Sequence, residues 1–375
     1  MGERFATRVR VVSRALANAP RRRSGAGGGT RRVLVAHNLL LGDTLMLTPL
    51  LAKIRARIPA ADIALLARPA FLPLYAGRPY GVRTLAFTPS RSSTVRALLD
   101  EPPFDLAFVV GDNRYSWLAA ALRARRIVAH AGDRPASKSW FVDESRPYAA
   151  EPRAWGDMVA DLLDGEDAPP YCAADWPAPP AAPFERPSGR YAVLHVGAST
   201  PLKRWLPERW LALAEALAHD GLEPVWSAGP GEEPLVEACD PSRRFRSLAG
   251  RADLAQLWHL LAGAALLVAP DTGVAHLGRV TATPTVALFG PGSAPICGRG
   301  RFWRDMPWEA VGVEPFPCRD QRVLFRRELP WVRRCGRSTA ECAEPRCMQA
   351  IGLAPVLEAA ARMRPAGHPP APPAR

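Results

Sequence analysis

Apolar positions along the chain form short continuous runs of strand length, separated by longer stretches in which they recur at helical spacing. In the first half, continuous apolar runs predict buried strands at residues 33–36, 63–67, 106–110 and 127–129. Helical spacing predicts helices at residues 44–57, 94–99 and 117–122. Strands that alternate with helices indicate a parallel sheet covered by helices.

The same alternation returns in the second half of the chain. Strands are predicted at residues 191–196, 224–227, 264–269 and 285–289. Helices are predicted at residues 208–218, 253–262 and 355–363, with another directly after Asp271. Between Asp164 and Arg190 stand seven prolines with little apolar periodicity, which is the composition of a stiff, extended linker. The pattern therefore predicts an α/β protein built from two similar halves that face a cleft.

These features divide the chain into six segments. We expect a basic N-terminal tail (1–30), an N-terminal domain (31–164), a proline-rich linker (165–190), a C-terminal domain (191–348), a C-terminal helix (349–364) and a disordered tail (365–375). A length of 375 residues with 48% hydrophobic content is enough for two domains of ordinary size.

The composition argues against a membrane-spanning or secreted chain. The longest apolar stretch, at 39–51, is broken by Asp43 and is shorter than the roughly 18 residues of a spanning helix. Arg14 interrupts the apolar run 11–19, so a cleaved signal peptide is also disfavoured. We therefore expect a cytoplasmic protein.

The net charge of +13 is concentrated in two segments. Residues 1–32 carry nine arginines against one acid, residues 319–337 carry seven against two acids, and the remainder sums to zero. Two local basic patches indicate contact with an anionic surface, such as phospholipid headgroups or a phosphorylated glycolipid. A solvated tail and an arginine-rich loop would show the same pattern. Nucleic acid is disfavoured because the patches lack interleaved aromatic residues.

Four of the seven cysteines, Cys318, Cys335, Cys342 and Cys347, fall within thirty residues. Without a secretory signal, structural disulfides are not expected. The four could form a thiolate metal site or be buried thiols. Because no CxxC pair is present and the spacings match no common zinc pattern, buried thiols are the favoured interpretation.

The motif Asp-Thr-Gly-Val-Ala-His at 271–276 predicts the start of a phosphate-binding helix. Pro270 ends the preceding strand, Asp271 can cap the helix, and the amide of Gly273 could approach an anion closely. Thr272 and His276 stand four residues apart, so a helix would place the hydroxyl and the imidazole on one face. The ligand to expect is a nucleotide diphosphate.

Three motifs together resemble the heptosyltransferase family, family 9 of the inverting glycosyltransferases. They are Leu-Gly-Asp-Thr at 41–44 with Thr-Pro-Leu-Leu at 48–51, Lys-Arg-Trp-Leu-Pro at 203–207, and the block from Asp271 to Pro291. They occur in family order and at family-like spacing, over roughly residues 31–356. The resemblance implies a GT-B fold: two Rossmann-like domains facing a central cleft, the first receiving the acceptor and the second binding a nucleotide-activated sugar.

The resemblance assigns catalytic roles to Asp43 and Lys203. Asp43 matches the proposed family base, which removes the proton from the acceptor hydroxyl during a single inverting displacement. On its sequence context alone, capping of the following helix would be the commoner role for Asp43. Lys203 matches the lysine that faces the donor diphosphate and would stabilise its departure, with Arg204 able to share the role. Ser199 and Thr200 match hydroxyl positions in the same phosphate-binding loop.

The remaining donor-binding residues follow from the same resemblance. Glu232 matches an acidic residue near the donor ribose, with Glu233 as the adjacent alternative, and either could instead be an acid of the first helical turn. In the block from Asp271 to His276, we expect Thr272, Gly273 and His276 to contact phosphate directly. Asp271 should instead cap the helix or orient His276, because its charge repels phosphate. The family pattern names no metal, cofactor or acceptor-binding residue for this chain.

The chain departs from the family pattern in three places. His37 stands where many members have Arg or Lys, which puts recognition of an anionic acceptor in doubt. Arg279 replaces a small apolar residue and could contact phosphate or face solvent. The segment 318–347 resembles cysteine-bearing segments of some members, but the resemblance assigns it no role.

The resemblance implies a metal-independent inverting glycosyltransferase that moves heptose from ADP-heptose to the lipopolysaccharide inner core or a related glycolipid. The basic N-terminal segment would dock such an enzyme peripherally on the inner leaflet. Two alternatives remain open: a protein-directed heptosyltransferase, for which the cysteines are the argument, and a non-catalytic nucleotide-sugar-binding protein.

Overall fold

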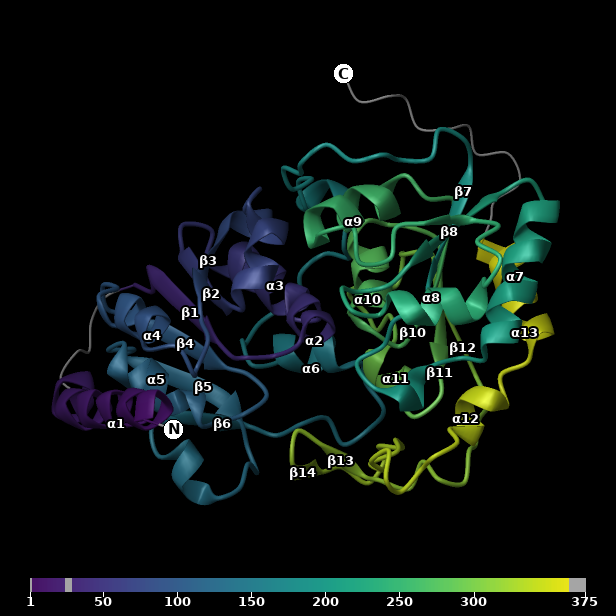
Figure 1. The fold of residues 1–375 in the computed structure, drawn as a ribbon. Helices are drawn as coiled ribbons and strands as arrows, with labels where there is room; N and C mark the ends of the chain where they lie inside the picture. The colour runs from purple at the N-terminus through teal and green to yellow at the C-terminus, as the bar shows by residue number, and fades with distance from the viewer. Residues whose placement is uncertain (1, 24–28, 364–375) are drawn as a thin grey trace. The chain divides into compact units, whose positions relative to one another are not determined.

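The computed structural model describes residues 2–23 and 29–363, and the chain divides into two compact units (Figure 1). The first unit contains Met1–Pro177 and Arg322–Trp331, and the second contains Ala178–Gln321 and Val332–Arg375. The division at Pro177 lies within the proline-rich stretch 165–190. The expected disordered tail (365–375) lies outside the described residues. The domain limits expected from the sequence stay predictions.

The first unit contains a six-stranded parallel sheet in the order β3-β2-β1-β4-β5-β6. Its strands are β1 (Arg32–Ala36), β2 (Asp62–Ala67), β3 (Val82–Ala86), β4 (Leu106–Val109), β5 (Arg126–His130) and β6 (Glu144–Arg146). The four strands predicted in this half are confirmed as β1, β2, β4 and β5. The two outer strands were not predicted, because their residues are largely half-buried and carry no continuous apolar run.

The helices of the first unit are α1 (Gly2–Arg23), α2 (Leu41–Leu45), α3 (Thr48–Arg57), α4 (Ser92–Leu99), α5 (Tyr115–Ala121) and α6 (Trp155–Ala160). Short 3-10 turns lie at Pro69–Tyr75, Pro79–Gly81, Ala136–Ser139 and Ala173–Asp175. The prediction of one helix over 44–57 is wrong, because the helix is interrupted between α2 and α3. Pro49 lacks an amide hydrogen and lies in the first turn of α3, where that hydrogen is not needed.

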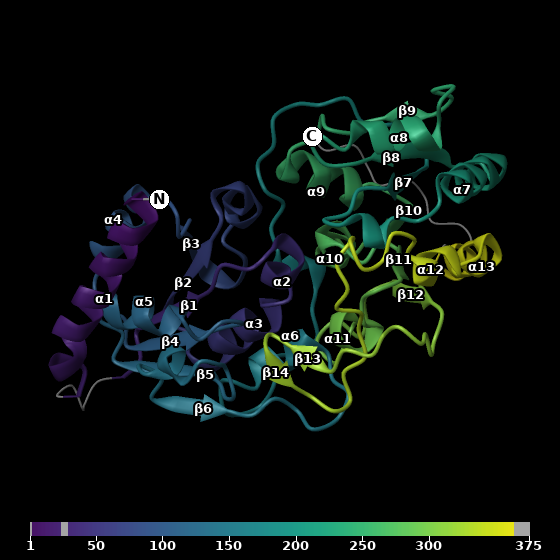
Figure 2. The same ribbon diagram turned by 60° about the horizontal axis from the view of Figure 1, so that its bottom comes forward.

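Residues 2–23 form a helix although the sequence suggested only a basic tail. Thr7, Ala15 and Asn18 of α1 are buried, and α1 lies alongside α4 and α5 in both views (Figures 1 and 2). The Asn18 amide donates to the carbonyls of Ala120 and Ala121 at the end of α5, at 3.3 and 3.1 Å. These contacts stabilise a segment that composition alone could not place.

The second unit repeats the topology of the first, with strand order β12-β11-β10-β7-β8-β9 and all neighbouring strands parallel. Its strands are β7 (Tyr191–His195), β8 (Glu223–Ser227), β9 (Arg246–Ser247), β10 (Leu266–Pro270), β11 (Thr285–Phe289) and β12 (Trp308–Gly312). Numbered from the first strand of each unit, both sheets have the order 3-2-1-4-5-6 of a Rossmann-like dinucleotide-binding fold. The predicted α/β class and the two Rossmann-like units are confirmed.

The helices of the second unit are α7 (Pro207–His219), α8 (Glu233–Cys239), α9 (Leu254–Ala262), α10 (Gly273–Val280), α11 (Ala294–Cys297), α12 (Arg346–Gln349) and α13 (Leu353–Met363). A 3-10 turn at Pro201–Lys203 follows β7. Asp253 and Gln256 form a capping box at the start of α9. Trp210 and Trp226 are almost fully buried in the core beside the sheet, so the parallel strands have a rigid support.

A hairpin of β13 (Val323–Leu324) and β14 (Arg327–Glu328) lies in the C-terminal half of the sequence but packs with the first unit. Two residues at its tip, Phe325 and Arg326, adopt positive φ angles of 45° and 65°, as a tight turn requires. The Phe325 ring lies 4.7 Å from the Trp155 ring of α6, measured between centroids. The chain therefore leaves the second unit, contributes this hairpin to the first, and returns.

Arg327 is the residue that fastens the hairpin. Its guanidinium donates to the Gly111 carbonyl at 2.7 Å, the Ala131 carbonyl at 2.8 Å and the Asn113 side-chain oxygen at 2.8 Å. These groups follow β4 and β5, so one side chain satisfies acceptors at the carboxyl ends of two neighbouring strands. The neighbouring Arg326 side chain is 61% exposed.

The interpretation of residues 319–337 as an anion-contacting surface is wrong for two of the arginines. Arg327 and Arg319 are buried, and Arg319 donates to the carbonyls of Gly290 and Phe289 at 2.5 and 2.9 Å. A count of charges cannot separate an exposed arginine from one whose donors are used within the protein.

We expect Arg327→Ala to lower the free energy of unfolding by roughly 3–5 kcal/mol, because it removes a buried, hydrogen-bonded cation and leaves its acceptors without donors. Arg326→Ala is the matched control, and its effect should stay within about 0.5 kcal/mol. Urea unfolding followed by tryptophan fluorescence measures both. Equal midpoints for the two variants would contradict the anchoring role of Arg327.

Candidate active site

The predicted donor-binding residues gather at the carboxyl ends of β8, β7 and β10, which are neighbours in the second sheet. Ser199, Thr200 and Lys203 follow β7, Glu232 follows β8, and the segment 271–276 follows β10. The strand order reverses between β7 and β10. Ligands of open parallel sheets bind at such a reversal, beyond the carboxyl ends of the strands.

The helix start after β10 is built differently from the prediction. Thr272, with extended backbone angles of φ −138° and ψ 174°, is the N-cap residue of α10. The prediction that Asp271 caps this helix is therefore wrong, and no side chain caps it. The first amides of a helix lack partners within the helix and carry a partial positive charge. The start of α10 therefore offers backbone donors to an anion.

The carboxylate of Asp271 instead binds the ammonium of Lys203. Lys203 Nζ lies 2.9 Å from Asp271 Oδ2 and 2.6 Å from the Asp271 carbonyl oxygen. Asp271 is 6% exposed, and it approaches Gly292 so closely that a Cβ there would collide with its Oδ2 atom. The salt bridge holds a cation from the β7 loop at the start of α10.

Two polar atoms beside this ion pair have no hydrogen-bond partner. They are Thr272 Oγ1 and His276 Nδ1, both shielded from solvent. Burial lowers the pKa of His276 well below its usual value, and the charges of Arg279 and Lys203 lower it further. The imidazole is therefore neutral at physiological pH and can donate one hydrogen bond. A buried polar atom without a partner costs free energy, so these two indicate a place for a ligand.

Glu232 connects two of the loops rather than pointing away from the protein. Its carboxylate accepts hydrogen bonds from the amide of Gly229 at 2.8 Å and the amide of Ala198 at 3.1 Å. A carboxylate has about four acceptor positions, so these bonds leave capacity for a hydroxyl group. Glu233 lies in the first turn of α8 and accepts from Gly231 at 3.2 Å. Contact between Glu232 and a ribose stays a prediction.

The hydroxyl positions after β7 differ in their environment. Thr200 is the N-cap of the 3-10 turn, and its Oγ1 accepts from the Leu202 amide at 3.4 Å. Ser199 is exposed. The adjacent Arg204 is half-buried, and its Nε atom has no partner. Both hydroxyls lie in the loop that carries Lys203, as a phosphate-binding loop requires.

Asp271, His276 and Cys297 form a group whose potential ligand atoms lie within 4.8 Å of one another. Their chemistry fits a metal by ligand type. The same Asp271 carboxylate is, however, paired with Lys203, and Arg279 adds a second cation beside His276. Two fixed positive charges oppose a divalent cation, and they favour an anion at this place.

Arg279 does not face solvent, so that alternative is wrong. It is 2% exposed, its Nη1 atom donates to the Gly298 carbonyl at 2.9 Å, and its guanidinium carbon lies 4.3 Å from the centre of the Trp308 ring. Burial lowers its pKa to about 10, so it stays charged at neutral pH. Arg279 anchors the end of α11 and adds positive potential to the site.

In the first unit, Asp43 lies at the carboxyl end of β1, within the first turn of α2. It is not an N-cap residue, since that position belongs to Leu40, and no side chain caps α2. Burial raises the pKa of Tyr148, and the nearby Asp43 charge acts in the same direction. The Asp43 carboxylate thus stands beside a phenol, at the sheet edge where acceptor binding was predicted.

His37 does not supply the positive charge that the resemblance led us to look for at this position. It is 1% exposed, its Nδ1 atom accepts from the Leu39 amide at 3.1 Å, and its Nε2 atom has no partner. Burial, followed by the charge of Arg68, lowers its pKa to about 3. His37 is therefore neutral, and Arg68 is the permanent cation beside it. Sequence reasoning missed Arg68 because nothing in its spacing marks it.

The hairpin of β13 and β14 also reaches this edge of the first sheet. A Cβ on Gly111 would meet Leu39 at 3.0 Å and Phe325 at 3.5 Å, so the tip of the hairpin lies against the loop after β1. The exposed Arg326 stands 3.8 Å from Asp112. Sequence reasoning did not assign the hairpin to this edge, because the hairpin is distant in sequence from the first unit. The charge pattern indicated only that the segment is basic.

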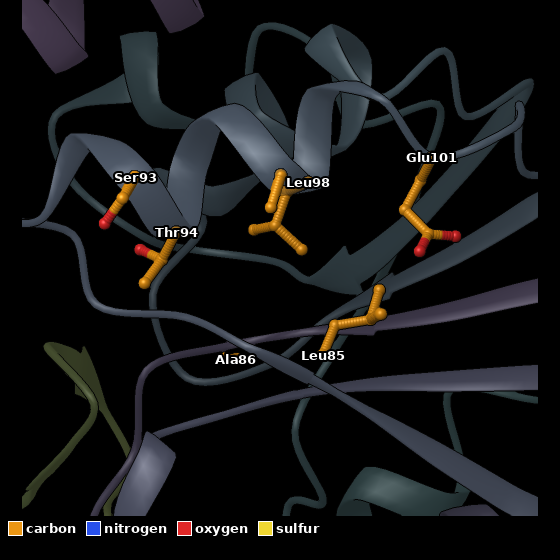
Figure 3. Close-up of a pocket in the computed structure, with 7 residues that line it drawn as sticks. Leu85, Ala86, Ser93, Thr94, Leu98 and Glu101 are labelled. Carbon is orange, nitrogen blue, oxygen red and sulfur yellow. The ribbon is translucent and has the colours of Figure 1, made fainter.

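A cavity of about 330 Å³ lies elsewhere in the first unit, between β3 and α4 (Figure 3). Leu85 and Leu98 line it, and Glu101 is its charged group. The Glu101 carboxylate accepts from Arg83 at 2.8 Å and from Arg32 at 3.0 Å. Its charge is therefore neutralised within the protein, and the cavity belongs to neither predicted site.

Three of the clustered cysteines come together in the second unit. Cys318 contacts Cys335 by a side-chain hydrogen bond, and Cys347 lies near enough to both for their charges to interact. They surround the turn after β11: the Cys335 amide donates to the Pro291 carbonyl at 2.9 Å, and a Cβ on Gly290 would meet the Cys347 sulfur at 3.3 Å. Cys342 donates to the Glu344 carbonyl at 3.3 Å. In the part of the chain that the structure describes, the cysteines form no disulfide.

Comparisons with known proteins agree with this arrangement. Residues 158–299 match the family model of glycosyltransferase family 9 (heptosyltransferase). Lipopolysaccharide heptosyltransferase 1 of Pseudomonas aeruginosa is 34% identical over 113 residues, which are 28% of this chain and 30% of that enzyme. The match thus spans less than a third of that enzyme. The segment that matches the family model includes the loops after β7, β8 and β10 but not Asp43.

Among solved structures, ADP-heptose lipopolysaccharide heptosyltransferase II of Escherichia coli matches with a TM-score of 0.65 and 18% identity, over 89% of this chain and 98% of that chain. The iron-containing dodecameric glycosyltransferase TibC of enterotoxigenic E. coli matches with a TM-score of 0.54 and 12% identity, over 89% and 76%. At these identities the likeness establishes the fold. In the described residues, no helix is long and apolar enough to cross a membrane.

Proposed function

Because the chain resembles the heptosyltransferases of glycosyltransferase family 9, as its motifs predicted, we propose that it is an inverting glycosyltransferase. We propose that it moves a heptose from ADP-heptose to the lipopolysaccharide inner core or a related glycolipid. The observation that carries the proposal is the anion site at the start of α10, where Lys203 meets Asp271 beside the unpartnered Thr272 and His276. This site lies within the segment that matches the family model.

The donor diphosphate would bind at this site. The Gly273 amide, the Thr272 hydroxyl and the neutral His276 imidazole can each donate to phosphate oxygens. Lys203 would shift part of its interaction from Asp271 to the diphosphate as the bond to the sugar breaks, which stabilises the negative charge on the leaving group. Glu232, and the hydroxyls of Ser199 and Thr200, would hold the nucleotide beside it.

The acceptor would be activated on the first unit. The Asp43 carboxylate takes the proton of the attacking hydroxyl, the hydroxyl oxygen bonds to the anomeric carbon, and the bond from that carbon to the diphosphate breaks with both electrons leaving on ADP. One displacement inverts the anomeric configuration. Arg68 would supply the positive charge for an anionic acceptor that His37, being neutral, cannot supply.

Catalysis in this proposal needs no metal ion. Lys203, the amides at the start of α10 and the buried Arg279 supply the positive potential that a divalent cation supplies in other transferases. We further propose a cytoplasmic enzyme that associates peripherally with the inner face of the membrane, where a glycolipid acceptor would be reached.

The gathered thiols favour a second candidate, transfer of the sugar to a protein. Cys318 contacts Cys335, and Cys347 lies near both, and thiolates are ligands for iron and zinc. Among the described residues, the group with the spacing of a metal site is Asp271, His276 and Cys297, so a metal at the three thiols would need them to move closer together. The structurally similar TibC is described as iron-containing. A metal held here would brace the turn at Gly290 and Pro291, close to Asp271, and would have a structural role.

Calorimetric titration with ADP, UDP and GDP tests the donor site. We expect ADP to bind best. Lys203→Ala and His276→Ala should each weaken ADP binding by about tenfold or more, because a hydrogen bond to a charged group contributes roughly 1.5–3 kcal/mol. Arg362→Ala removes an exposed cation of the same unit and should leave the affinity unchanged. Preference for UDP or GDP would replace the donor, and absence of binding would reject the start of α10 as a nucleotide site. ADP binding without sugar transfer would favour the non-catalytic alternative.

Asp43→Asn should lower kcat roughly 10²–10⁴-fold while ADP affinity stays the same, because the amide keeps the shape but cannot accept the proton. Transfer from ADP-heptose to truncated lipopolysaccharide measures the rate. Asp62 lies at the opposite end of a strand of the same sheet. Asp62→Asn is therefore the control and should retain the rate. A retained rate in Asp43→Asn would assign the base to another residue.

Metal analysis of the purified protein separates the two acceptor classes. The protein-directed candidate predicts about one iron or zinc ion per chain, lost in a Cys318→Ser/Cys335→Ser variant. The glycolipid candidate predicts metal-free protein and an unchanged rate in that variant. Cys172→Ser, which changes an exposed cysteine of the first unit, is the control for loss of a thiol alone.

A further inference from the structure

Helix α1 packs on the first unit mainly with small and polar residues, together with the half-buried Val11. Thr7, Ala15 and Asn18 are its buried positions, and Arg14 donates to the Leu99 carbonyl at the end of α4 at 3.2 Å. These residues recur at intervals of eight and three, which places them on one side of a helix. This inner face fixes which side of α1 is turned outward.

The outward side carries the large apolar residues of α1. Phe5 is 71% exposed, Leu16 is 54% exposed, and Val9 and Val12 are 49% and 39% exposed. Their spacing of four, three and four residues makes them one continuous stripe along the helix. Four of the seven exposed large apolar side chains in the described part of the chain belong to this stripe.

This arrangement is the reverse of an ordinary surface helix. In a helix that only packs on its own protein, the large apolar residues face the core and the small or polar residues face water. Scattered apolar side chains on a surface are common, but a continuous row of them marks a binding face. The outer stripe of α1 therefore indicates a partner that the described chain does not supply.

Charge identifies the partner. Arg8 stands three residues after Phe5 and four before Val12, so it lies beside the stripe, and Arg8 and Arg10 are both exposed. Residues 1–32 contain nine arginines and one acid. An apolar stripe bordered by arginines matches an anionic lipid surface, where the stripe enters the acyl boundary and the arginines meet phosphates. Trp140 of the same unit is also exposed, and its ring centroid lies 5.6 Å from that of Trp117 in α5. Tryptophan is a residue type enriched at membrane interfaces.

We propose that the outer stripe of α1, formed by Phe5, Val9, Val12 and Leu16, is a lipid-binding face that lies in the surface of an anionic membrane. The arginines within α1 would keep the helix at the interface, where they meet lipid phosphates. This inference rests on the proposed function, because a glycolipid acceptor is the reason for the enzyme to lie at a membrane. Binding of α1 to lipid does not itself depend on binding of the nucleotide donor.

Co-sedimentation of the full chain with vesicles tests the proposal. Vesicles of phosphatidylcholine with phosphatidylglycerol should bind the wild type, and vesicles of phosphatidylcholine alone should bind it at least tenfold less. Val9→Asp/Leu16→Asp should reduce binding to anionic vesicles at least tenfold, and Arg8→Glu should reduce it by a smaller factor. Val313→Asp changes an exposed valine of the second unit and should bind as the wild type does.

Urea unfolding of the same samples shows whether each variant is folded, and calorimetry with ADP tests the donor site separately. Leu16→Gln provides a milder change should the double variant fail to fold. Wild-type vesicle binding by the stripe variants would overturn the proposal. So would a stripe variant that turns a dimer into a monomer without changing vesicle binding, because the face would then bind a second copy. Vesicle binding without nucleotide binding would leave this inference standing and reject the proposed function.

Discussion

The salt bridge between Lys203 and Asp271 is the interaction on which the proposed donor site depends. An ammonium group near a helix N-terminus is repelled by the partial charge of that end, and Asp271 offsets this repulsion from a distance of 2.9 Å. Thr272 and His276 remain with unpartnered polar atoms. The loop after β7 and the start of α10 are thus held together in a form that still has polar atoms without partners.

The two sheets and most of their helices could be predicted, because buried parallel strands are continuous apolar runs and their ends coincide with Gly, Pro and Asp. Edge strands such as β3 and β6 were missed, since half-buried residues lose that signal. Within the site, residue types and spacing indicated the phosphate-binding loops. They could not show that Thr272, rather than Asp271, is the N-cap, because either residue type can hold that position.

The remaining errors concern contacts between residues distant in sequence. Arg327 and Arg326 are adjacent and identical in type, yet one is buried among carbonyl oxygens of the first sheet and the other is exposed. Only the path of the chain, which leaves the second unit and returns, makes that difference. Glu232 is a similar case: its two backbone partners, Ala198 and Gly229, belong to separate loops. A charge pattern records the groups that are present, and tertiary structure decides which of them are already satisfied.

Helix α1 shows the same principle in apolar residues. Its small residues, such as Ala15, allow close packing on α5, and this packing leaves Phe5, Val9 and Leu16 outside. A rotation of α1 about its axis would bury these apolar side chains, but the hydrogen bonds from Asn18 to the end of α5 fix the orientation of the helix. An acceptor with a lipid anchor lies at a membrane surface, and an enzyme that carries a helix with an apolar outer face can stay there while its donor site remains in water. The orientation of α1 is therefore more easily explained by a membrane surface than by the folding of the first unit alone.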